Sequence, residues 1–269
     1  MANLIEPGPV TDTTGIREAV CIHTRKIFDS CRDKDCVEDL RLYPTQSSQA
    51  AIDRAISLKA GQAELLYAYI DVEPVGFNRG FFTVDVRYFY RITADAFVGT
   101  TRPVTISGLA VFDKRAILFG SEGAAKVFSS DSAGRSNHLK NNLPIAVVDS
   151  VDPIILGMKL VDARDSICSD GDGSDIPDAI AGCFQGDLNF GGEGKRVYVT
   201  LGQFSIIRLE RESQLLIPAY DYCVPSKECT GSYEEEDPCS VFRKVQFPME
   251  EFFPPNTITQ PEDPRSSFC

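Results

Sequence analysis

Residues able to bind a metal or form crosslinks are concentrated near the amino terminus. Cys21, His23, Cys31 and Cys36 lie within sixteen positions of a 269-residue chain that has nine cysteines and two histidines. Thiolate sulfur and imidazole nitrogen are ligands that tetrahedral zinc prefers. The spacing, C-x-H followed by C-x4-C, differs from the paired C-x2-C arrangement of many structural zinc sites. Zinc binding is therefore an alternative to disulfide formation at these four residues.

Catalytic chemistry has little support in the sequence. Five carboxylates, from Asp29 to Asp39, surround the first cysteines, and their negative charge disfavours a nucleophilic thiolate. The other histidine, His138, lies in a polar segment, and the chain has neither a glycine-rich phosphate loop nor a nucleophile elbow. We therefore predict that the protein is not an enzyme, and a cytosolic thiol enzyme is the least favoured interpretation.

The other six cysteines all lie in the second half of the chain. A disulfide between Cys168 and Cys183 would close a loop and stabilise the fold by about 3 kcal/mol in the chain-entropy model. The total is odd, so one cysteine is left over, and Cys269 at the chain end is our candidate for an intermolecular crosslink. The disulfide candidates are Cys21, Cys31, Cys36, Cys168, Cys183, Cys223, Cys229 and Cys239.

The loop between Cys168 and Cys183 is acidic. Asp170, Asp172 and Ser174 offer oxygen atoms with the spacing of the first ligands of a calcium-binding loop. The twelfth position is Ala181 instead of glutamate, so the loop is not an EF-hand. A weaker calcium site at these three residues is a second metal hypothesis, and a solvated turn is favoured over it.

Composition indicates a globular protein. The chain is 43% hydrophobic and 25% charged, with a net charge of -12, which disfavours nucleic acid as a partner. No basic region followed by an apolar core begins the chain, and no apolar run approaches the ~18 residues of a membrane helix. We expect synthesis in a cytoplasm without a signal peptide or a membrane span.

Hydrophobic alternation predicts a mainly β protein with antiparallel pairing, either a sandwich or a barrel-like body. Residues 82–93 carry the clearest alternation, with apolar side chains on one face. Other strands are predicted at residues 64–72, 104–112, 115–119, 145–148, 154–161, 196–210 and 215–222.

Local signals add detail to this pattern. Residues 46–60 have helical spacing and predict the one short helix, although an extended conformation is the alternative. Asp113 and Lys114 are predicted to form a two-residue turn between two strands. Gly202 is predicted to mark a β-bulge.

The chain divides by composition into three parts. Residues 1–19 form an extended amino-terminal arm rich in proline, glycine and threonine. Residues 20–224 form the β-rich body, which includes the Cys/His segment 20–44. Residues 225–269 form an irregular tail rich in proline and glutamate. Within this tail, residues 241–253 are apolar and could pack either on the body or on a neighbouring chain.

Three blocks resemble an uncharacterised protein family of clostridial, spore-forming Firmicutes. They are CIHTRKIFDSCRDKDCVEDLR, AELLYAYIDVEPVGFNRGFFTVDVRYFYRI and LLIPAYDYCVP, and they lie within residues 20–225. The resemblance implies a link to sporulation, with a role in the spore coat, the exosporium or an appendage. Such proteins are made in a reducing mother cell, and their thiols meet oxidant only after that cell lyses.

Together these features predict a structural protein that assembles with copies of itself into a filament or lattice on the spore surface. Disulfides would stabilise the assembly, and strand addition at an open sheet edge would join neighbouring chains. Other spore-surface proteins are further expected partners, and no cofactor is expected. The alternative is a zinc-binding structural or regulatory module that uses Cys21, His23, Cys31 and Cys36.

Overall fold

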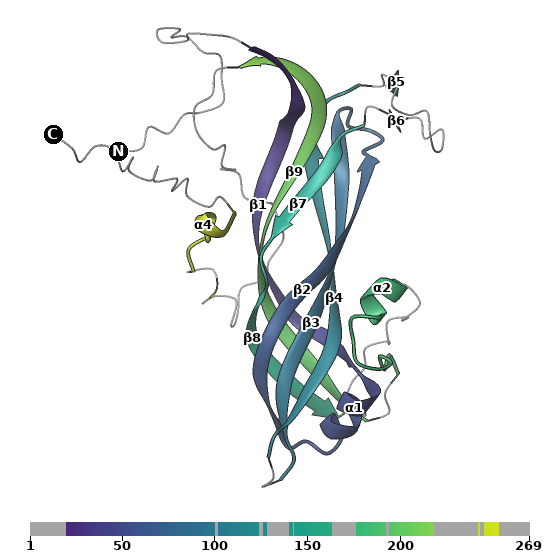
Figure 1. Cartoon of the computed structure of the whole chain (residues 1–269), viewed down its shortest axis with the longest axis vertical. Helices are drawn as coiled ribbons and strands as arrows, with labels where there is room; N and C mark the ends of the chain where they lie inside the picture. Colours follow the sequence, from purple (N-terminus) through teal and green to yellow (C-terminus); the bar gives the residue numbers. More distant parts are fainter. Residues whose placement is uncertain are drawn as a thin grey trace, which may run out of the picture.

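The fold is a seven-stranded antiparallel sheet that curls into a nearly closed barrel (Figure 1). The computed structural model describes residues 20–99, 102–123, 126–127, 140–141, 143–162, 176–191, 194–217, 242 and 245–252. The strands of the sheet are β1 (Val20–Pro44), β2 (Ser57–Pro74), β3 (Phe81–Phe97), β4 (Val104–Phe119), β7 (Ile145–Ser150), β8 (Ile154–Asp162) and β9 (Lys195–Ile217). Outside it lie β5 (Lys126–Val127), β6 (Lys140–Asn141), α1 (Gln46–Ile52), α2 (Asp178–Ala181) and α4 (Met249–Phe252).

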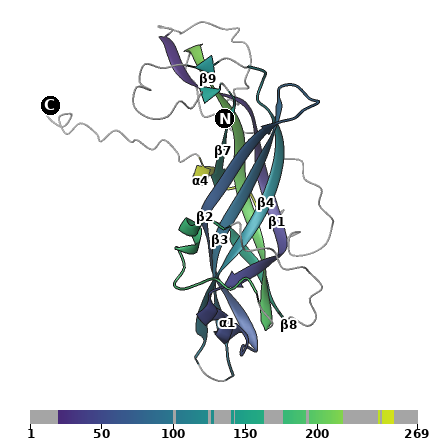
Figure 2. The same ribbon diagram turned by 90° about the vertical axis from the view of Figure 1, so that its right-hand side faces the viewer.

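The sheet order is β2-β3-β4-β1-β9-β7, with β8 also paired to β9. The predicted mainly β, barrel-like class is confirmed. In Figures 1 and 2, α1 lies at one end of the barrel, and the ribbon of β1 and β9 extends beyond the other end. The described residues contain α2 and α4 in addition to the one helix predicted. None of these described helices is long and apolar enough to cross a membrane.

The predicted alternation of residues 82–93 is confirmed and continues over the whole of β3. Its apolar side chains point into the barrel and are at most 6% exposed. They are Phe82, Val84, Val86, Tyr88, Tyr90 and Ile92. Successive side chains of a strand point to opposite faces, so this strand lines the core with one face and meets the outer surface with the other.

The Cys/His segment is itself a long strand, which the sequence pattern did not predict. β1 pairs with β9 from Val20, opposite Ile217, to Leu42, opposite Val197. Cys31, Asp33 and Asp35 on this strand are buried. Polar residues on the inner face hid the hydrophobic alternation that would have indicated a strand.

Two local predictions in the sheet are wrong. Asp113 and Lys114 form no turn, because β4 is one continuous strand and both residues pair in register with β3. Gly202 marks no bulge, because it pairs in regular register with Cys36. The missing side chain at Gly202 instead makes room for the ring of Phe242, which would lie 2.7 Å from an added Cβ.

The predicted helix at residues 46–60 is shorter than expected. Thr45 caps the amino end of α1, where its side chain accepts a hydrogen bond from the Ser48 backbone N–H at 3.3 Å. The helix ends at Ile52, and β2 begins at Ser57. The extended alternative therefore holds for the last residues of the predicted helix.

The barrel has two halves, one formed by β2, β3 and β4 and the other by β1, β7, β8 and β9. The two halves come close together at one junction. β1 and β4 pair through Tyr43 with Leu109 and through Pro44 with Gly108. A Cβ at Gly108 would lie 2.7 Å from the Tyr43 carbonyl oxygen and 2.8 Å from the Pro44 Cα. Only glycine allows the two backbones to come this close without movement.

We expect Gly108→Ala to lower the free energy of unfolding by about 1–3 kcal/mol, because the added methyl group meets backbone atoms that cannot rotate away. Urea denaturation followed by circular dichroism would measure this loss. Gly157→Ala in β8 is the matched control, since no atom lies within 4 Å of an added Cβ there. Equal stability of the two variants would contradict the close junction.

Candidate assembly site

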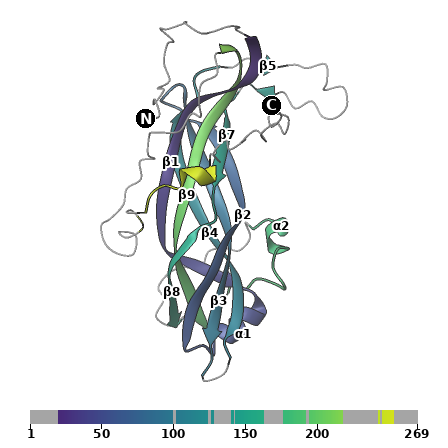
Figure 3. The same ribbon diagram turned by 60° about the vertical axis from the view of Figure 1, so that its left-hand side comes forward.

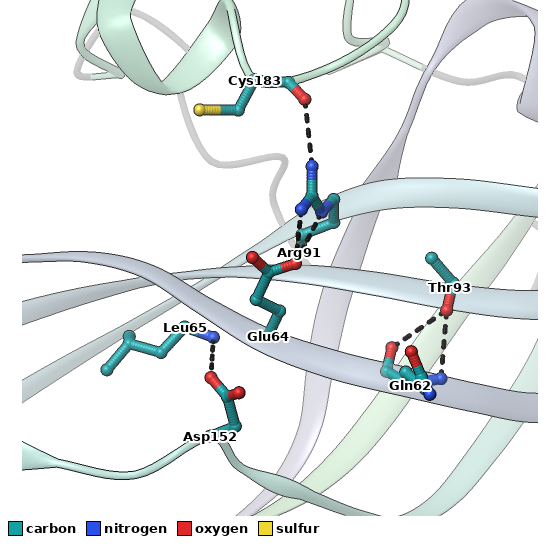
Figure 4. A network of polar contacts seen from close by, with 7 residues as sticks. All are labelled: Gln62, Glu64, Leu65, Arg91, Thr93, Asp152 and Cys183. Atoms are coloured by element: carbon teal, nitrogen blue, oxygen red, sulfur yellow. Dashed lines mark hydrogen bonds and ion pairs between the residues drawn. The ribbon is translucent and has the colours of Figure 1, made fainter.

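β2 is an edge strand of the sheet. It pairs with β3 on one side, and no strand among the described residues pairs with its other side. β7 and β8 lie beside that open side (Figure 1). The Leu65 backbone N–H donates a hydrogen bond of 2.8 Å to Asp152 Oδ1 across the gap (Figure 4). An unpaired strand edge is a template for pairing with another chain.

A groove of about 760 Å³ lies along this seam between residues 60–64 of β2 and residues 152–155. Arg91 and Thr93 from β3 also line it. The Arg91 Nε lies 3.0 Å from Glu64 Oε2, and the Gln62 backbone N–H donates to Thr93 Oγ1 at 3.0 Å (Figure 4). The groove is thus lined by polar and apolar groups, with the ion pair of Arg91 and Glu64 and the carboxylate of Asp152, and backbone of β2 runs along it.

The outer face next to the open edge carries two exposed tyrosines. Tyr67 is 52% exposed and Tyr69 is 56% exposed. Beside them, Arg87 Nε lies 2.6 Å from Asp113 Oδ1, and an equivalent pair joins Arg115 to Asp85. Exposed ion pairs between neighbouring strands contribute little stability, while tyrosine is enriched among residues that dominate binding. Tyr67 and Tyr69 are therefore the candidate contact groups of this face.

The apolar segment of the tail packs on the body of the same chain. The Phe242 ring lies 4.6 Å from the Phe204 ring on β9, and Lys34 Nζ donates to the Val245 carbonyl oxygen at 2.8 Å. Phe247 completes the cluster, 5.3 Å from Phe204, and α4 follows it on the side of the barrel that faces the viewer in Figure 3. Of the two alternatives for this segment, the described residues show packing on the body.

The prediction that four side chains of the Cys/His segment bind one zinc ion is wrong. Cys21, His23, Cys31 and Cys36 lie on one extended strand, where five residues span about 16 Å. Cys31 faces inward opposite Ile207, whereas Cys36 lies opposite Gly202 on the outer face. Both cysteines are disulfide-bonded, so neither offers a thiolate. No group of three or more metal-binding side chains occurs among the described residues.

The disulfide partners of Cys31 and Cys36 lie outside the described residues. The two cannot bond to each other or to Cys21, because a disulfide requires Cα atoms within about 7 Å and all three lie far apart on β1. Cys183 is excluded because its thiol is free.

The predicted bridge between Cys168 and Cys183 is also wrong. Cys183 is exposed and reduced, and its Sγ donates to the Ala179 carbonyl oxygen at 3.3 Å. A free thiol thus occurs at Cys183, whereas the sequence analysis chose Cys269 for that role. The remaining predicted residues lie outside the described residues, as does the Cys21 side chain. They are Cys168, Cys223, Cys229, Cys239, Cys269, His138, Asp170, Asp172 and Ser174.

A cluster of charged residues lies inside the barrel, and the sequence pattern did not predict it. Asp33 and Asp35 were considered only for their effect on thiols, and Lys114 was placed in a turn. All three side chains are less than 9% exposed and converge at one point. The spacing of Cys31, Asp33 and Asp35 could have predicted that these side chains lie together, because residues two apart on a strand share a face.

The chain is similar to exosporium protein A of Clostridium sporogenes. The two are 41% identical over 66 residues, which make up 24% of this chain. The matched segment covers 20% of the Clostridium protein, so the similarity is partial. No family model matches the chain, and no solved structure matches it. The finding links the chain to a protein named for the outer layer of a spore.

We expect iodoacetamide to label Cys183 in folded protein purified without reductant. Cys31 and Cys36 should become labelled only after reduction, because their sulfur atoms are in disulfides. Peptide mapping by mass spectrometry would locate the labels, and Cys183→Ser would serve as the control. Labelling of Cys31 or Cys36 before reduction would contradict these assignments.

Proposed function

We propose that this protein is a structural, non-enzymatic component of the spore surface. The observation that carries the proposal is the similarity to exosporium protein A. The resemblance of the blocks in residues 20–225 to a family of spore-forming Firmicutes supports the same location. The protein would be made in the mother-cell cytoplasm and would then become part of the spore surface.

We further propose that copies of the chain associate into a filament or lattice by strand addition at β2. The open side of β2 offers backbone groups along a strand of 18 residues. An extended segment of a neighbouring copy would pair there, and its side chains would lie beside Tyr67 and Tyr69. Other spore-surface proteins with an extended segment could use the same edge.

Disulfides would then stabilise the assembled layer. β1 carries a disulfide-bonded cysteine on each of its faces, Cys31 on the inner face and Cys36 on the outer face. The exposed thiol of Cys183 lies near the seam, because the Cys183 carbonyl oxygen accepts a hydrogen bond from Arg91 Nη1 at 3.3 Å (Figure 4). Together with Cys269, it is the candidate for bonds between copies.

Electron microscopy of the purified protein and antibody labelling of intact spores test this function. Ordered filaments or sheets, with antibody bound at the spore surface, would support it. Monodisperse single particles at high protein concentration, together with unlabelled spores, would contradict it.

We expect the double variant Tyr67→Lys/Tyr69→Lys to raise the concentration needed for assembly at least about tenfold. Each tyrosine at an interface centre contributes more than about 1 kcal/mol, and lysine on an edge strand opposes pairing. Light scattering against concentration measures the change. Ile56→Lys is the matched control, because Ile56 is 75% exposed and precedes β2. Assembly of the double variant at the control's concentration would exclude β2 as the interface.

A further inference from the structure

A buried lysine meets two buried carboxylates inside the barrel. Lys114 Nζ is in direct contact with Asp33 Oδ2 and donates a hydrogen bond of 2.6 Å to Asp35 Oδ1. Asp33 and Asp35 lie two residues apart on the inner face of β1, while Lys114 lies on β4. The Lys34 backbone N–H donates to Asp33 Oδ1 at 2.8 Å, which holds the Asp33 carboxylate in place.

The surroundings of this cluster exclude water. Tyr88 and Tyr90 from β3 are at most 1% exposed, and Ser205, which pairs with Asp33 across β1 and β9, is fully buried. Burial raises the pKa of Tyr88 to about 12, against a smaller opposing effect of the Ser205 hydroxyl. Tyr88 therefore keeps its proton at neutral pH.

An ordinary ion pair explains this arrangement poorly. Two buried carboxylates contact the same buried ammonium, and each buried charge is expensive to remove from water. Burial also lowers the pKa of Lys114 to about 8, which makes the neutral amine accessible. A surface pair shows the contrast: Lys159 Nζ lies 2.9 Å from Asp39 Oδ1 with both side chains more than half exposed.

The cluster instead meets the requirements for forming an amide bond. Amide formation needs an amine nucleophile, a carboxyl carbon held against it and a neighbouring group that transfers protons. Lys114 supplies the amine, Asp33 the carboxyl group, and Asp35 contacts the same nitrogen from the other side. Exclusion of water favours neutral groups and removes the competing nucleophile.

We propose that Lys114 and Asp33 condense into an intramolecular isopeptide bond, with Asp35 transferring the protons. Asp35 takes a proton from the Lys114 ammonium, and the free amine attacks Cγ of Asp33. The Cγ–Oδ2 bond then breaks, and Oδ2 leaves with two protons from the amine nitrogen as one water molecule. Asp35 ends unchanged, and no oxidant or reductant takes part.

The bond would join the two halves of the barrel. β1 and β4 are paired through backbone only near Tyr43 and Gly108, and beyond this junction side chains bridge the strands. One bridge runs from the Phe119 backbone N–H to Asp29 Oδ2 at 3.0 Å. An isopeptide bond at Lys114 would hold the halves together under reducing conditions, and it stands independently of the proposed spore function.

Intact mass spectrometry of the folded, full-length protein tests the proposal after reduction and denaturation. We expect a mass below the sequence mass by one water molecule, and a crosslinked peptide that contains both Asp33 and Lys114. Lys114→Arg keeps the positive charge but should restore the full mass. Lys159→Arg removes the amine of an exposed ion pair and should retain the deficit.

A folded wild-type protein with the full sequence mass overturns the proposal, whatever the folding of the variants. Asp35→Asn tests the proton-transfer role separately, because it leaves both bonding groups in place. We expect most of that variant to remain without the crosslink. Complete crosslinking of Asp35→Asn would exclude Asp35 from the reaction.

Discussion

The pairing of β1 with β9 is the interaction on which the rest of the structure depends. The two strands lie at opposite ends of the described sheet-forming chain and run antiparallel over twenty residue pairs. β7 and β8 both attach to β9, and β4 attaches to β1. Such non-local pairing is entropically costly to begin, because a long stretch of chain must be brought together before the strands can pair.

Because β1 pairs with β9 as a strand, the side chains of the Cys/His segment alternate between its two faces. Cys31, Asp33 and Asp35 point into the barrel, while Lys34 and Cys36 point toward the phenylalanines of the tail. One strand thus supplies both a buried polar cluster and an outer docking surface. The alternation of a strand separates groups that look like a single cluster in the sequence, so Cys31 and Cys36 cannot bind the same ion.

The edge of the sheet at β2 differs from the β1–β9 pair, because the backbone groups on its open side are not paired with another described strand. The barrel does not close by backbone pairing between β2 and β8 in the part that the structure describes, so a long strand edge stays open there. Many proteins cover or charge such edges to avoid association. The exposed tyrosines beside this edge are the groups on which the proposed association of copies depends.

The sequence alone determined the β class, the face of β3 that lines the core and the apolar character of the tail segment. These follow from local side-chain periodicity, which any strand expresses within a few residues. Only tertiary structure decided that β1 is a strand, that Lys114 reaches Asp33 and that Cys31 and Cys36 face apart. Those features depend on which distant strands pair and in which register, and a shift of one residue would reverse every side chain.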